Sequence, residues 1–122
     1  MTKEKKYGVR ALMIAAMFAV GGAVVPMQSA QAAVNAAAAQ AIYKANACAS
    51  CHSATQKLIG PAYADIAAKY KNDPGAGARL EKVVKNGGSG VWGPIPMPSH
   101  PGMSDADIRT VVTWILAGAP AK

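Results

Sequence analysis

The stretch NACASCHSA, residues 46–54, holds both cysteines of the chain and one of its two histidines. Cys48 and Cys51 are separated by two residues, and His52 follows the second cysteine directly. A disulfide, a metal site and a covalently attached haem all use residues of these types. The rest of the sequence has to decide among the three.

The first third of the chain has the composition of a secretory signal peptide. Residues 1–10 carry four basic side chains, residues 11–25 form an apolar run without a charge, and small residues follow. These are the three parts of a cleaved signal, and we expect cleavage after Ala32. A retained membrane anchor is the alternative, but this run is shorter than the about 20 residues of a spanning helix. We therefore predict a cleaved secretory signal peptide over residues 1–32 and one domain over residues 33–122.

Export across a membrane would change how the remaining residues are interpreted. The exported part keeps nine of the 13 basic and five of the six acidic residues, a net charge of +4 before any cofactor is counted. This mild positive charge suits contact with acidic patches on partner proteins. The sequence has no cluster of basic residues of the kind that would indicate nucleic-acid binding. The exported part contains no Phe. Because so small a domain buries limited apolar surface, a bulky apolar cofactor would help to fill its core.

The residue pattern of the exported part predicts an all-α domain. Four segments carry the apolar spacing or the end signals of helices: 36–49, 61–70, 78–86 and 104–117. Ser104 and Asp107 form a shorter variant of the capping box at the start of the last segment. Gly and Pro are so frequent over residues 87–102 that we expect neither helix nor regular sheet there.

The motif C-x-x-C-H over residues 48–52 is the attachment signature of a c-type haem. Two thiols with this spacing can add to the two vinyl groups along one haem edge, and His52 can then supply an axial nitrogen to the iron. A zinc site would need four ligands, usually from two such units, and only one is present. A thioredoxin-like centre would need a βαβ framework, which the pattern does not predict. The sequence favours one covalently bound haem c over a structural disulfide.

Three residues of the Gly/Pro-rich segment have side chains that can occupy the sixth position of a haem iron: Met97, His100 and Met103. Met97 lies between two prolines, which fix φ and stiffen the segment. Met103 directly precedes the Ser104 cap, so we expect it to pack against the last helix. His100 is expected to be solvated. Because electron-transfer cytochromes c commonly pair Met with His, Met97 is the predicted sixth ligand.

Several segments resemble the small class I c-type cytochromes of the bacterial periplasm, the cytochrome c-551 group. They are CASCH (48–52), GPAYADIAAKY (60–70), VVKNGGSGVWGPIPMP (83–98) and SDADIRTVVTWIL (104–116). The resemblance spans residues 39–116 and implies about four helices wrapped around one covalently attached haem. It also implies that the first and last helices cross, with Tyr43 and Trp114 at or beside the crossing.

The resemblance implies roles for further residues. Pro61 matches a proline whose carbonyl accepts the proton on the outer nitrogen of the haem histidine, and the same residue suits the start of a helix. Trp92 matches a tryptophan that hydrogen-bonds a haem propionate, although a large side chain can also simply fill the core. Two positions depart from the group. Val83 stands where some relatives carry Arg or His near the inner propionate, and His100 stands where relatives often have an Asn that donates to the ligand sulfur.

These features favour an electron carrier over two other classes of protein. The prediction is a soluble periplasmic monohaem protein that cycles between Fe(II) and Fe(III) and is not an enzyme. A haem enzyme or sensor would need an open sixth position and residues for a distal pocket. A disulfide-only module would leave both the scarcity of core aromatics and the Gly/Pro-rich segment unexplained.

The partners expected of such a carrier are periplasmic redox proteins, a reductase or an oxidase. Lys44, Lys57 and Lys85 are expected near the haem edge, where they would steer docking. We expect a monomer that binds no nucleic acid and has no stable membrane insertion after cleavage.

Overall fold

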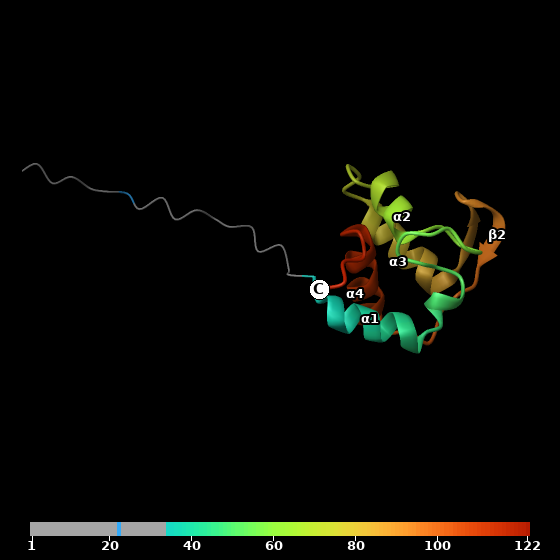
Figure 1. Cartoon of the computed structure of the whole chain (residues 1–122), viewed down its shortest axis with the longest axis horizontal. Helices are drawn as coiled ribbons and strands as arrows, with labels where there is room; N and C mark the ends of the chain where they lie inside the picture. The colour runs from blue at the N-terminus through green and yellow to red at the C-terminus, as the bar shows by residue number, and fades with distance from the viewer. Residues whose placement is uncertain (1–21, 23–33) are drawn as a thin grey trace, which may run out of the picture.

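Figure 1 shows the computed structural model of the chain, which describes Gly22 and residues 34–122. The signal peptide predicted for residues 1–32 falls outside the described residues except at Gly22, so it stays a prediction. The elements in chain order are α1 (Ala36–Ala45), the 3-10 turn η1 (Cys48–Ser50), α2 (Tyr63–Lys69), α3 (Ala76–Asn86), β1 (Gly88–Gly90), β2 (Gly93–Met97) and α4 (Asp105–Leu116). Within the described ranges, no helix is long and apolar enough to cross a membrane.

Helix α4 is the centre of the fold. The other three α-helices each contact α4, which confirms the predicted helical class with about four helices. In Figure 1 the C-terminus lies beside the start of α1, and β2 lies at the opposite edge of the domain. The Gln40 side-chain amide on α1 donates to the carbonyl oxygen of Ala121 at 3.1 Å, which ties the C-terminal segment to the first helix.

The core is an apolar cluster built around the buried face of α4. Ile108 and Val112 are 2% and 1% exposed, and Met103 is buried in the same cluster, as the sequence predicted. Tyr43 of α1 and Trp114 of α4 pack at the contact between these two helices, with ring centroids 6.0 Å apart. Tyr63 of α2 meets both rings, at 5.8 Å from Tyr43 and 5.7 Å from Trp114. Three helices therefore share one aromatic contact.

The first helix is shorter than the predicted 36–49. Asn46 ends α1, because its backbone N–H and its side-chain amide both donate to the carbonyl of Ile42, at 3.1 and 2.9 Å. Ala47 then takes a φ of 55°, in the left-handed region, and the chain enters η1. The break places Cys48 in a separate tight turn and not at the end of a helix.

The other helix starts lie close to their predicted positions. The Ser104 hydroxyl accepts a hydrogen bond from the Asp107 N–H at 3.1 Å, which is the predicted cap of α4. Helix α2 begins at Tyr63 and not at Pro61, because the intervening Ala62 is extended. Helix α3 begins at Ala76, two residues before the predicted start.

The Gly/Pro-rich segment forms a small antiparallel hairpin, so the expectation of no regular sheet over residues 87–102 is wrong. Strand β1 pairs with β2 through Gly88 with Met97 and Gly90 with Gly93, and the register shifts between these pairs. Pro94 and Pro96 lie between the paired residues Gly93 and Met97, where a residue without an N–H takes no hydrogen bond away from a paired position. Frequent proline predicted the absence of a strand, but here it occupies only the unpaired positions of an edge.

Candidate functional site

The candidate functional site is an apolar cavity of about 430 Å³ between the cysteine turn, α2, α3, α4 and the β-hairpin. All six residues that the sequence singled out line this cavity: Cys48, Cys51, His52, Pro61, Trp92 and Met97. Apolar side chains from three helices complete its wall, among them Ile66, Leu80 and Val112. Segments as far apart in the sequence as Cys48 and Val112 therefore meet around one apolar space.

The cysteine turn brings both thiols to the same wall of the cavity. The carbonyl oxygen of Cys48 accepts the backbone N–H groups of Cys51 at 3.1 Å and of His52 at 2.9 Å, which closes a tight turn. Both cysteines are free thiols and partly buried. Burial raises the pKa of the Cys48 thiol, and the nearby Cys51 adds to the rise. An apolar setting of this kind suits neutral thioethers better than thiolates.

His52 is held in one orientation by its neighbours. Its Nδ1 lies 2.8 Å from the carbonyl oxygen of Pro61, which can only accept, so Nδ1 carries the proton and Nε2 keeps its lone pair. The ring stacks on Tyr63, with centroids 5.2 Å apart and planes 19° apart. The Tyr43 hydroxyl donates to the His52 carbonyl at 2.9 Å. Gly60 packs so tightly on the imidazole that an added Cβ would lie 2.5 Å from Cε1.

Helix α2 contributes to this orientation through its first turn. The backbone N–H groups of Tyr63 and Ala64 donate to the carbonyls of Ser53 and Ala54, at 3.0 and 2.9 Å. These bonds satisfy two amides that have no partner inside the helix. They also anchor the loop directly after His52 to the helix that carries its stacking partner.

Met97 lines the cavity from a different element, at the end of β2. Gly87, with a φ of +77°, lets the chain leave α3 and pass close to this strand, since a Cβ there would lie 2.7 Å from the Met97 carbonyl oxygen. The His100 N–H donates to the Val84 carbonyl at 3.0 Å, which fixes the chain after Met97 to α3. Val83, the other departure from the resemblance, also lines the cavity.

His100 is not the solvated side chain that the sequence predicted. It is partly buried and lines the cavity, and its Nδ1 is buried. Among the residues that the structure describes, this is the only buried side-chain nitrogen or oxygen without a hydrogen-bond partner.

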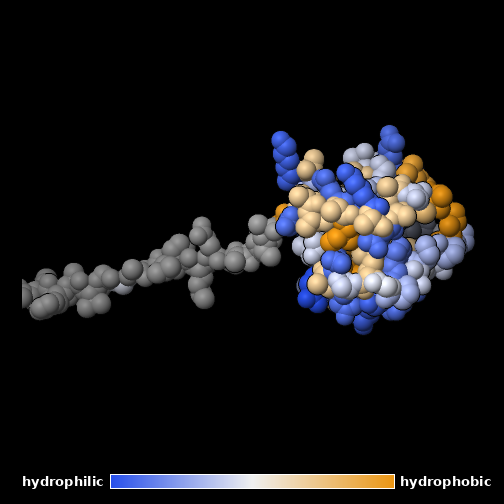
Figure 2. Space-filling model, turned by 90° about the horizontal axis from the view of Figure 1, so that it is seen from below, coloured by the Kyte–Doolittle hydropathy of each residue, from blue (hydrophilic) through white to orange (hydrophobic). Residues whose placement is uncertain are grey.

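The mouth of the cavity is apolar and flanked by lysines. Ile59, Val91, Trp92 and Ile95 line the cavity and are 59%, 63%, 39% and 63% exposed. Figure 2 shows apolar side chains gathered at the right-hand edge of the domain, the edge where Figure 1 places β2. The Lys69 Nζ lies 5.5 Å above the centre of the Trp92 ring, a cation–π contact.

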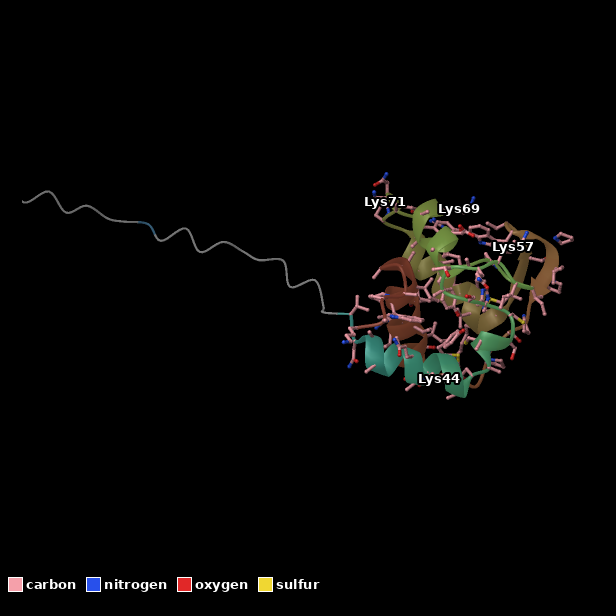
Figure 3. The ribbon with its side chains drawn as sticks, viewed as in Figure 1. Lys44, Lys57, Lys69 and Lys71 are labelled. Atoms are coloured by element: carbon pink, nitrogen blue, oxygen red, sulfur yellow. The ribbon has the colours of Figure 1, made fainter. Side chains whose placement is uncertain are left out.

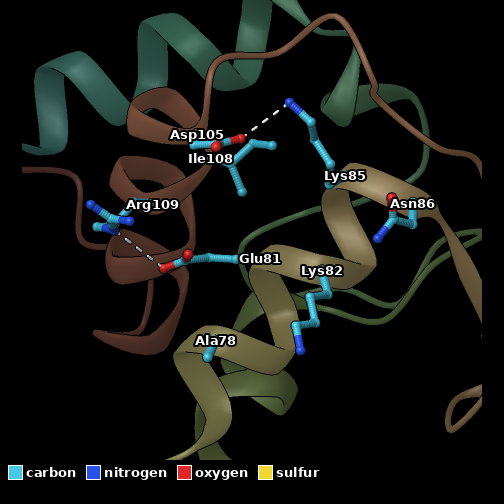
Figure 4. A pocket seen from close by; sticks show the side chains of 8 residues that line it. All are labelled: Ala78, Glu81, Lys82, Lys85, Asn86, Asp105, Ile108 and Arg109. Carbon is cyan, nitrogen blue, oxygen red and sulfur yellow. Dashed lines mark ion pairs between the residues drawn. The ribbon is translucent and has the colours of Figure 1, made fainter.

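The lysines lie on different faces of the domain. Figure 3 shows Lys57 and Lys69 near the cavity mouth, while Lys44 projects from α1. Lys85, which was expected at the haem edge, points into a groove between α3 and α4 (Figure 4). Its Nζ donates to the Met103 carbonyl at 2.7 Å and pairs with Asp105 at 3.1 Å. This groove contains two ion pairs but no sulfur or imidazole, so it lacks the ligands of the cavity.

The residues of the cavity fit a c-type haem. Two thiols, one oriented imidazole and one thioether line one cavity, and most of the other lining side chains are apolar. Sequence reasoning missed Gly60 and Gly87, whose contacts link residues that meet only in the folded chain. The only sequence signal was their place beside Pro61 and at the end of a predicted helix.

Comparison with known proteins agrees with this fit. The family model for cytochrome c matches residues 36–119. The chain is 44% identical to cytochrome c-551 of Pseudomonas aeruginosa over 78 residues, which are 64% of this chain and 74% of that protein. It is 41% identical to cytochrome c-551 of Stutzerimonas stutzeri over 101 residues, 83% of this chain and 91% of that protein. A crystal structure of wild-type Nitrosomonas europaea cytochrome c552 matches with a TM-score of 0.62 and 45% identity, covering 64% of this chain and 96% of that chain.

Proposed function

The chain belongs to the cytochrome c family, and from this premise we propose that it is a soluble, monomeric electron carrier of the periplasm. It is a small class I member of the c-551 group and has one covalently bound haem c. One observation carries the proposal: the cysteine turn, His52 and Met97 meet at a single apolar cavity. When bound, the haem supplies one-electron chemistry, because its iron cycles between Fe(II) and Fe(III).

Each cavity residue has a role in this proposal. The two cysteines would hold the haem as thioethers, and His52 and Met97 would bind its iron. The Pro61 carbonyl keeps the proton on Nδ1 of His52, so Nε2 remains a donor to iron with raised basicity. Trp92, at the cavity rim, would donate its indole N–H to a haem propionate.

The ligand pair favours a carrier over an enzyme. With haem bound, the His52 imidazole and the Met97 thioether would both bind its iron, which would leave no site on iron for a substrate. Electron carriers of this family are generally not enzymes. The contacts around His52 and the short hairpin behind Met97 also restrain both ligands, so little rearrangement accompanies a change of oxidation state.

The proposed partners are periplasmic redox proteins with an acidic patch around an apolar centre. The apolar mouth of the cavity, flanked by Lys57 and Lys69, is the complementary surface. We expect Lys57→Glu and Lys69→Glu to lower the rate of electron exchange with a small acidic redox protein and to weaken its dependence on salt. Lys82→Glu makes the same charge change on exposed α3 and serves as the matched control.

The test of the ligand assignment is the optical spectrum of the protein matured in a periplasm. We expect a low-spin spectrum with sharp reduced bands and, in the oxidised protein, the weak band of a sulfur–iron bond. Met97→Leu removes this band, whereas Met103→Leu keeps it. A high-spin spectrum that shifts with carbon monoxide would mean an open iron and would favour an enzyme or a sensor.

Cell fractionation and N-terminal sequencing test the proposed periplasmic location. Cell fractionation should recover the haem protein in the periplasm, and its N-terminal sequence should begin at about residue 33, after the predicted cleavage site. Recovery of the full-length chain in the membrane fraction would support the retained anchor.

A further inference from the structure

The side chain of His100 has no established role in the cavity wall, yet it is held close to Met97. Its backbone N–H donates to the Val84 carbonyl at 3.0 Å, and its own carbonyl accepts the Met103 N–H at 3.1 Å. The backbone is therefore fixed on both sides, and the imidazole lines the same cavity as Met97, three residues away.

The imidazole of His100 is the one side chain of this wall with an unsatisfied polar group. Its Nδ1 is buried without a partner among the described residues, whereas Nδ1 of His52 is bonded to Pro61. A buried nitrogen without a hydrogen-bond partner destabilises the resting position of the ring, and a position that gives a ring nitrogen a partner relieves this cost.

Loss of Met97 from iron would provide such a position. We propose that His100 is a reserve iron ligand, which takes the sixth position through a ring nitrogen when the Met97 thioether leaves. This inference rests on the proposed function, since it assumes that Met97 is the resting ligand. The role of His100 is then protective, because iron stays closed to small molecules such as carbon monoxide or a peroxide.

The other side chains near Met97 are less suited to this role. Met103 is 6% exposed and belongs to the core cluster with Ile108, and Lys85 holds its carbonyl, so moving it would open the core. Lys57 lines the cavity. Lysine amines are ordinarily protonated near neutral pH and then have no lone pair for iron, whereas an ordinary imidazole is largely neutral above pH 7.

Oxidation of the Met97 thioether is one way in which this side chain would leave iron. Its side chain is only partly buried, and the neighbouring residues of β2 from Pro94 to Pro96 are exposed. A peroxide can transfer one oxygen atom to a thioether in such a setting, which leaves water or an alcohol and turns the sulfur from a soft donor into a polar sulfoxide. A second ligand in the same cavity wall would keep iron six-coordinate after such damage.

The test compares Met97→Ala with the double variant Met97→Ala/His100→Gln, both matured with haem and measured slightly above neutral pH. We expect the single variant to be low-spin without the sulfur–iron band, and the double variant to be high-spin. If His100 occupies iron about nine-tenths of the time, the reduced single variant binds carbon monoxide roughly tenfold more weakly than the double variant. Equal spin state and equal carbon monoxide binding in the two variants would overturn the proposal.

Two controls keep the outcome interpretable. If Met97→Ala does not mature, Met97→Leu with and without His100→Gln gives the same comparison at nearly conserved side-chain volume. A low-spin double variant would mean that another residue binds iron, which also overturns the proposal. His100→Gln alone separates this inference from the proposed function: it keeps the sulfur–iron band if Met97 is the resting ligand. Loss of the band in that variant would instead refute the Met97 assignment.

Discussion

The two walls of the haem cavity are built in different ways. On the His52 wall, side chains and one carbonyl hold the proposed ligand: Tyr63 stacks on the ring, and the Pro61 oxygen lies 2.8 Å from Nδ1. On the Met97 wall, the backbone holds the proposed ligand, through the β-hairpin and the contact with Gly87. An imidazole can thus be oriented by packing, whereas a flexible thioether is positioned by fixing the chain that carries it. Glycine is the most vulnerable residue on both walls, for different reasons.

Gly87→Ala is expected to have the largest effect of the five changes below. A φ of +77° together with a ψ of 177° is essentially restricted to glycine and costs another residue about 1–3 kcal/mol. The new Cβ would also lie 2.7 Å from the Met97 carbonyl oxygen. Such overpacking costs about 1–3 kcal/mol more. Gly90→Ala is the matched control, since its φ is +100° but nothing lies within 4 Å of the new Cβ. Equal losses of unfolding free energy in urea would contradict the role of Gly87 in placing Met97.

Gly60→Ala tests the His52 wall through the contact of the new methyl group, because Gly60 does not have a positive φ. Its Cβ would meet the His52 ring at 2.5 Å, and the bond to Pro61 prevents the ring from turning away. We expect a loss of about 1–3 kcal/mol in unfolding free energy and a shifted reduction potential. Gly102→Ala, with open space around its Cβ, should change neither quantity. If voltammetry finds the same potential in both variants, the packing of Gly60 on His52 does not orient the ligand.

Lys85→Met asks whether a side chain also supports the Met97 wall. The change keeps most of the apolar stem but removes the bonds to the Met103 carbonyl and to Asp105. We expect a loss of about 1–2 kcal/mol, reduced from the value for buried charged bonds because the side chain is partly exposed. Chemical unfolding of Lys82→Met, a change at an exposed site of the same helix, supplies the reference. Equal stability of the two variants would restrict support of this wall to the backbone.

Tyr43→Phe makes the corresponding change on the His52 wall. It removes one hydroxyl, which donates to the His52 carbonyl at 2.9 Å, and keeps the ring in the aromatic contact. The expected loss is about 0.5–1.5 kcal/mol, the usual net value of one neutral hydrogen bond. A thermal scan of the holoprotein measures it. A stability gain would show that the hydroxyl is strained where it lies.

Asp73→Asn lies away from both walls and should have the smallest effect. The hydrogen bond from the Arg79 guanidinium and, secondarily, the one from the Gly75 amide hold the pKa of Asp73 below its ordinary 3.8. The carboxylate therefore stabilises the folded state above pH 3.8, and this contribution is lost as the pH falls through the lowered pKa. Melting temperatures of variant and wild type should differ slightly at neutral pH and converge in acid. A difference that persists in acid would assign the effect to something other than charge.

Much of this site was predictable because its signals are local. The spacing of Cys48, Cys51 and His52 predicted the cofactor, and Ser104 with Asp107 predicted the start of α4. The hairpin was missed because proline frequency does not reveal which residues pair across two strands.

The predicted positions of two further side chains were wrong for a related reason. His100 was expected in solvent. Its burial follows from the hydrogen bond between its backbone N–H and the Val84 carbonyl of α3, and no residue near His100 in the sequence indicates this contact. Lys85 was expected near the haem edge because of its charge alone. The direction of its side chain is decided by the Met103 carbonyl, which lies in another part of the chain.

The position of the C-terminus has a practical consequence for electrochemistry. The last residues lie beside α1, and the Ala121 carbonyl is bonded to Gln40 there, while the hairpin edge with the apolar mouth lies across the domain. A linker attached at Lys122 would therefore orient a monolayer on an electrode with the mouths facing the solution. Electrons would then have to cross the width of the domain to reach the metal surface. The same film would leave the docking face open to a dissolved partner, so one immobilised layer could report both slow interfacial exchange and undisturbed recognition.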